Sequence, residues 1–158
     1  MSLFWAAVGG GFLGSILGVV GSEIGGRIFE PRARRESRRD HQLEICRAHL
    51  DKIGSEAADY WGGKFEAHSR EVIAAEAMIV ANLHSLAGEA AELFQGDAKT
   101  VELCEQDIRR LRQLVTGGTF GDEQPKIDKR KIRDITSTVS EFRRALEKRR
   151  HEQKRGMF

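Results

Sequence analysis

The chain has 158 residues, which is enough for one domain with an appendage. Its 26 basic and 24 acidic residues leave a net charge of +2, which excludes a strongly basic, dedicated nucleic-acid-binding protein. The charge is unevenly distributed, because Leu3 to Ser22 carries none and the sequence after Glu23 is rich in charged, helix-forming residues. We therefore predict two parts, a membrane-spanning helix within residues 1–30 and a helical domain over residues 31–158.

The apolar segment from Leu3 to Ser22 has the length of a transmembrane helix, since twenty residues at about 1.5 Å each span roughly 30 Å. A cleaved signal peptide fits poorly, because no Lys or Arg precedes the segment and no clear A-x-A site follows it. The positive-inside rule then predicts a single-pass protein of the bacterial inner membrane, with its N-terminus outside and its C-terminal domain in the cytoplasm. We call the arginines after the span the basic collar, and expect them to contact anionic lipid: Arg27, Arg32, Arg34, Arg35, Arg38 and Arg39.

Glycine is unusually frequent in this span, although it costs roughly 1 kcal/mol against alanine in a water-exposed helix. On a helical wheel the small residues fall on one face, and small faces let transmembrane helices approach closely. Because each chain has one span, we predict self-association, and the wide face favours a ring of four or more copies over a simple dimeric anchor. The span-packing or pore-lining residues are Gly10, Gly11, Gly14, Ser15, Gly18, Gly21, Ser22 and Gly25.

The remaining sequence carries four amphipathic seams whose apolar residues recur in steps of three and four. Such seams predict an all-α fold in which an antiparallel four-helix bundle follows the transmembrane helix. Breaks are expected at Gly62-Gly63, at Gly96-Asp97 and from Gly117 to Pro125. The seams are Leu43, Cys46, Leu50, Ile53, Ala57 and Tyr60; Ile79, Leu83, Leu86, Ala90 and Leu93; Val101, Cys104, Ile108, Leu111 and Val115; and Ile132, Ile135, Val139, Phe142 and Leu146.

Motifs for catalysis are absent from the sequence, including the P-loop, the nucleophile elbow and H-E-x-x-H. Cys46, His49 and Cys104 have spacing that could hold a metal, but both cysteines lie on apolar seams, where Cys is usually a core residue. An R-x5-H match from Arg35 to His41 is expected by chance in so arginine-rich a chain. We predict a protein that is not an enzyme, with no cofactor, no metal and no disulfide in a reducing compartment.

Two further features bear on partners. The run from Arg143 to Arg155 is basic with few acids, and is either a solvated helix end or a docking site for a regulatory protein, RNA or a nucleotide. Tyr60 and Trp61 precede two glycines, where they are expected to plug the end of the bundle core and could also anchor a second subunit.

This layout resembles the small single-span membrane pore effectors of bacterial antiphage defence. It is similar to the pore-forming membrane protein of some RNA-guided CRISPR loci, and to single-span channel effectors that a nucleotidyltransferase partner restrains. The resemblance implies a ring of subunits around a pore that depolarises the infected cell, with Gly10, Gly14 and Gly18 lining or packing the pore. The alternative is a membrane-tethered helical scaffold or adaptor that recruits a partner.

Overall fold

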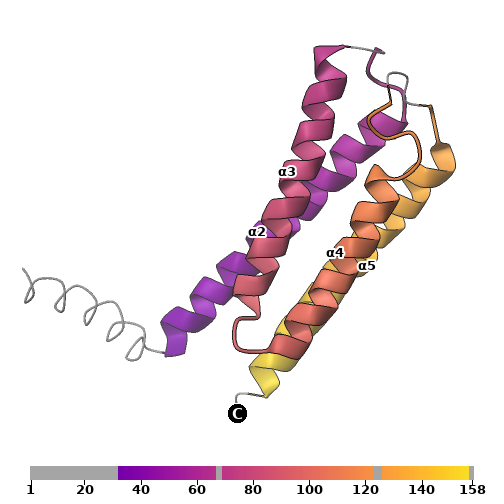
Figure 1. Ribbon diagram of the computed structural model, residues 1–158. Helices are drawn as coiled ribbons and strands as arrows, with labels where there is room; N and C mark the ends of the chain where they lie inside the picture. The colour runs from indigo at the N-terminus through magenta and orange to yellow at the C-terminus, as the bar shows by residue number, and fades with distance from the viewer. Residues whose placement is uncertain (1–31, 67–68, 123–125, 157–158) are drawn as a thin grey trace, which may run out of the picture. The chain divides into compact units, whose positions relative to one another are not determined.

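The computed structural model describes residues 32–66, 69–122 and 126–156, and these residues form four α-helices and no strand (Figure 1). The helices are α2, Arg32–Trp61; α3, Arg70–Leu93; α4, Ala98–Thr116; and α5, Lys129–Arg155. Across those described ranges, no helix combines the length and the apolar character that crossing a bilayer requires. The predicted span, its small-residue face from Gly10 to Gly25 and the collar residue Arg27 lie outside the described residues.

The chain divides into two compact units, residues 1–38 and residues 39–158. In the first unit the structure describes only the opening turns of α2. In the second unit the helices form the predicted antiparallel bundle. Tyr60 near the end of α2 bonds Glu76 near the start of α3, and Asp40 near the start of α2 pairs with Arg150 near the end of α5. Helix α4 packs against both α3 and α5.

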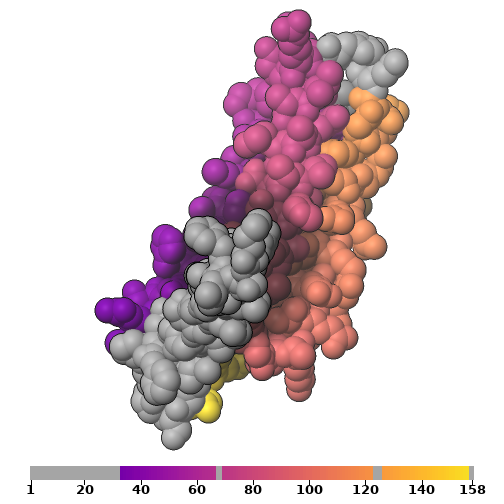
Figure 2. Space-filling view, turned by 60° about the vertical axis from the view of Figure 1, so that its left-hand side comes forward, coloured from indigo at the N-terminus to yellow at the C-terminus, as the bar shows by residue number. Residues whose placement is uncertain are grey.

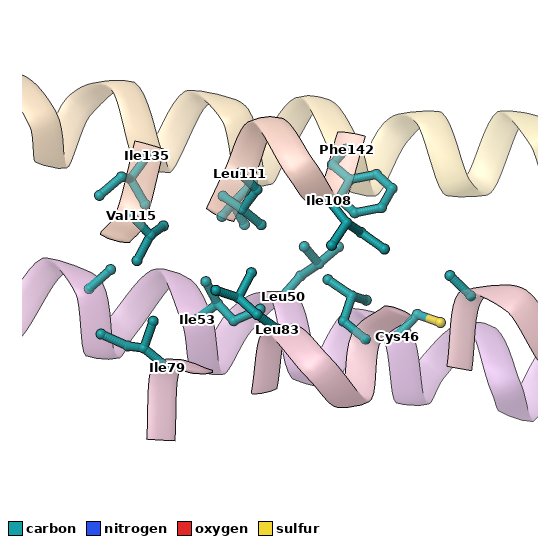
Figure 3. Packing of buried hydrophobic residues seen from close by; sticks show 14 of the residues in the cluster. Cys46, Leu50, Ile53, Ile79, Leu83, Ile108, Leu111, Val115, Ile135 and Phe142 are labelled. Carbon is teal, nitrogen blue, oxygen red and sulfur yellow. The ribbon is translucent and has the colours of Figure 1, made fainter. Parts of the chain in front are cut away.

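The core of the bundle is built from the four predicted seams, whose members are buried except for the half-buried Val101 and Ile132. Figure 3 shows Leu50 and Ile53 of α2 meeting Leu83 of α3 and Ile108 and Leu111 of α4 in the interior. Each fully buried aliphatic side chain contributes about 1.5–3 kcal/mol of transfer free energy. The core also takes in four residues that the seams do not include, Trp61, Val72, Ala75 and Phe94.

The helix boundaries lie where the sequence places its breakers. The second and third connections end in caps, because the side chain of Asp97 accepts from the Thr100 amide at 3.0 Å and that of Asp128 from the Lys131 amide at 2.9 Å. Gly96 has a φ of +93° between α3 and α4, a conformation that residues with a side chain rarely adopt. Ser69 caps α3 in the same way, at 3.2 Å from the Val72 amide.

Candidate functional site

A ladder of ion pairs joins α2 to α5 along one side of the bundle, and we call this ladder the α2 clamp. Four charged residues of α5 follow one another at steps of four, three and four: Arg143, Glu147, Arg150 and Lys154. The first two directly follow the buried positions Phe142 and Leu146. This spacing turns them toward α2, as expected for neighbours on one helix face. The clamp consists of Asp40, Arg47 and Asp51 on α2 and Arg143, Glu147, Arg150 and Lys154 on α5.

Asp40 and Arg150 make the most enclosed pair of the clamp. The side chain of Arg150 is only 3% exposed, and its Nε and Nη2 atoms lie 3.2 and 3.1 Å from Oδ1 of Asp40. Lys154 adds a second cation, with its Nζ 2.9 Å from the same carboxylate. Burial alone would raise the pKa of Asp40, but the hydrogen bond from Lys154 and the charge of Arg150 outweigh it and hold that pKa below 3.8. The carboxylate is therefore ionised at neutral pH and neutralises a buried guanidinium.

The clamp continues toward the middle of α2. Nη2 of Arg47 donates to Oε1 of Glu147 at 2.5 Å, while its other terminal nitrogen contacts Glu44 on the same helix. One turn further along α2, Asp51 pairs with Arg143. Because both partners of every pair carry charge, the clamp holds α2 by contacts that protonation or a competing ion can weaken.

The basic run at the end of α5 therefore has two sides. Arg143, Arg150 and Lys154 are engaged with acids of α2, and Arg149 lies 2.7 Å from Asp107 of α4. The exposed remainder is Arg144, Lys148, His151 and Arg155. The predicted docking of a regulatory protein, RNA or a nucleotide remains a prediction, and the surface available for it is this exposed side of α5.

Part of the basic collar falls on the first turns of α2. The side chains of Arg34, Arg35 and Arg38 are exposed, and that of Arg39 is half-buried. These arginines belong to α2, the helix of 30 residues from Arg32 to Trp61.

Tyr60 and Trp61 close the other end of the bundle. Tyr60 donates its hydroxyl to Glu76 at 2.8 Å and accepts from the Gly121 amide at 3.0 Å, and its ring lies 5.0 Å from that of Phe120. Burial, reinforced by the Glu76 carboxylate, raises the pKa of Tyr60 to about 12. Trp61 donates Nε1 to the Val115 carbonyl at 3.1 Å. The predicted plug is confirmed, while the role of these residues as a subunit anchor stays a prediction.

The cysteines and His49 occupy structural positions. Both cysteines are free thiols buried in the core, and burial, followed by the charge of Glu89, raises the pKa of Cys46 to about 12. His49 lies 2.8 Å through Nδ1 from Oδ1 of Asn82. Among the residues that the structure describes, no three His, Cys, Asp or Glu side chains come together as metal ligands would.

No protein-family model, no curated protein and no solved structure matches this chain. Its function is therefore inferred from its own residues. Sequence reasoning identified the basic run of α5 but missed its acidic partners on α2 and α4, because nothing in a local pattern specifies which helices become neighbours.

Proposed function

We propose that the protein is a homo-oligomeric membrane pore or channel effector of bacterial antiphage defence. In this proposal the span within residues 1–30 assembles through its glycine-rich face into a ring of four or more copies in the inner membrane, and the bundle lies in the cytoplasm. A stimulus to the bundle opens the pore and depolarises the cell. The wide small-residue face, a pattern expected where helices pack closely around an axis, supports this proposal.

The observation that carries the proposed gating is the course of α2. This helix begins with the collar arginines at the predicted membrane surface, and its next turns carry Asp40, Arg47 and Asp51 of the clamp. In this proposal, loosening the clamp changes the packing of the bundle, and this change tilts or separates the spans. The exposed basic side of α5 is the proposed docking place for the triggering protein, RNA or nucleotide.

The glycine face provides the test of the pore. Replacing Gly14 or Gly18 by Ile should abolish ring assembly, conductance in planar bilayers and toxicity on expression, because a branched side chain keeps the spans apart. Val19→Ile is the matched control, since Val19 lies on the larger-residue face and should tolerate the added methylene. Normal conductance in both glycine variants would sink the proposal.

The same assay separates the pore from a tethered scaffold. An unrelated leucine-rich span in place of Leu3 to Ser22 keeps the anchor but removes the glycine face. A pore should lose its activity in this chimera, and a scaffold that recruits a partner through its bundle should keep it.

A further inference from the structure

The outward face of α3 differs from the outward faces of the other three helices. Three of the five large hydrophobic side chains that are exposed in the described chain lie on it: Ile73 at 63%, Val80 at 49% and Met78 at 45%. Glu76 is turned toward α2, where its carboxylate accepts the Tyr60 hydroxyl at 2.8 Å. None of the exposed positions from Ile73 to Gly88 is Asp, Glu, Lys or Arg: they are Ile73, Ala74, Ala77, Met78, Val80, Ala81, His84, Ser85 and Gly88. In the space-filling view α3, in magenta, lies at the surface of the bundle (Figure 2).

This face is nearly palindromic about Ala81. Seven exposed residues follow one stripe in steps of four, three, four, four, three and four: Arg70, Ala74, Ala77, Ala81, Ser85, Gly88 and Glu92. If a second α3 lies antiparallel with Ala81 against Ala81, then Ala77 faces Ser85 and Ala74 faces Gly88. Arg70 of each copy then faces Glu92 of the other, so the stripe ends in two pairs of opposite charge.

Gly88 is not required by the bundle itself. It lies inside α3, where glycine costs about 1 kcal/mol against alanine, and a Cβ built on it meets nothing within 4 Å. The residue therefore weakens its own helix without relieving any contact among the described residues. Close approach of a second helix backbone is a use for a glycine at such a position.

We propose that α3 is a self-pairing surface, on which α3 of a second copy docks antiparallel about a two-fold axis at Ala81. A helix with a charged face would lose the hydration of its charges against four uncharged turns without gaining partners. The outward faces of α4 and α5 carry such charges, including Arg109 and Arg110 on α4 and Arg144 and Lys148 on α5. Among the described helices, only another α3 offers a matching neutral face with complementary ends.

The small size of the surface indicates a weak contact, which needs a second interaction to hold the copies together. A helix of 24 residues is about 36 Å long, and one helix pair covers less than the roughly 800 Å² per partner of a standard interface. Assembly through the span would hold the bundles at high effective concentration, and only this assistance rests on the proposed function. Because an isologous contact closes at two, copies paired in this way give an even number of subunits.

Cysteine cross-linking of the full chain in membranes tests the pairing. Ala81→Cys should form a disulfide-linked dimer under mild oxidation, because Ala81 faces itself across the axis. Ser137→Cys, an exposed position on α5, is the matched control and should remain mostly monomeric. Cys46 and Cys104 are 0% and 1% exposed and should add little background. Equal cross-linking at both positions would overturn the proposal.

A charge swap distinguishes specific pairing from random collisions between copies in the membrane. Adding Arg70→Glu to Ala81→Cys places like charges at both ends of the stripe and should lower the dimer yield several-fold, and adding Glu92→Arg as well should restore it. A dimer yield that stays the same in the swapped variants would contradict the pairing. Conductance read on the same variants separates the two proposals: an active pore without the α3 dimer refutes only the pairing, and the dimer without conductance refutes only the pore.

Discussion

Helices α3 and α5 of the same bundle differ in where their charged residues lie and in what those residues contact. Helix α5 carries eleven basic and four acidic residues, and Arg143, Arg149, Arg150 and Lys154 reach acids on α2 or α4. Helix α3 carries one basic and four acidic residues, yet its outward face is uncharged from Ile73 to Gly88. The charges of α5 are thus partly explained by the fold that surrounds them. The neutral face of α3 has no such explanation among the residues that the structure describes, and we assign it to a contact between copies.

The largest effect should come from removing Asp40, the carboxylate of α2 that pairs with Arg150 of α5. Asp40→Ala removes the carboxylate that accepts from Nε and Nη2 of the buried Arg150, and we expect the free energy of unfolding to fall by about 2 kcal/mol. Glu152→Ala is the control, because Glu152 and Lys148 form an exposed pair at 3.9 Å that contributes less than about 0.5 kcal/mol. Denaturant unfolding of the full chain, followed by its helical signal, measures both. Equal losses would show that the clamp is an ordinary surface feature.

The Asp40 effect should also have a pH signature. Its pKa is below 3.8 in the folded chain, so the unfolded chain binds the proton more readily, and the stabilisation is complete above that value and lost as the pH falls through the folded pKa. Asp40→Asn removes the titration but keeps the shape. The difference in unfolding free energy between wild type and Asp40→Asn should therefore be largest at neutral pH and shrink at strongly acid pH. A difference that is constant with pH would assign the loss to packing rather than to charge.

The smallest effect should come from a substitution on α3, and this substitution should raise the free energy of unfolding rather than lower it. Gly88→Ala should raise the free energy of unfolding by about 1 kcal/mol, because the new methyl group meets no atom of the bundle and alanine favours the helix. Thermal unfolding of the full chain, with the helical signal as readout, detects the change. A loss of stability would mean that the bundle does need this glycine, and would remove one support of the α3 pairing.

The bundle could be predicted from the sequence because its determinants are local. Apolar residues at three- and four-residue steps, with glycines and capping aspartates between them, predict both the helices and their ends, and Trp61 and Asp97 lie where the breakers place them. The clamp could not be predicted in this way. Arg150 pairs with a residue 110 positions earlier, and within its own run it looks like one more solvated base. The partner of Arg150 depends on which helices become its neighbours. That arrangement depends in turn on the packing of all four helices.

The palindrome of α3 lies in the sequence, but it is noticed only once the exposed positions are known. Ala74, Ala77 and Ala81 are typical helix residues, and nothing local distinguishes an outward alanine from a core one. The structure separates them, because Ala75 and Ala90 are buried while Ala74 and Ala81 face out.

The central claim is that copies of this chain assemble into a closed ring around a pore. Its most direct test is the mass of the detergent-solubilised full chain by mass photometry, combined with two-dimensional averages of single particles. The account predicts a closed ring with an even number of copies, four or more, and density through the micelle along its axis. A monomer or a dimer would provide too few spans to enclose a channel and would contradict the claim.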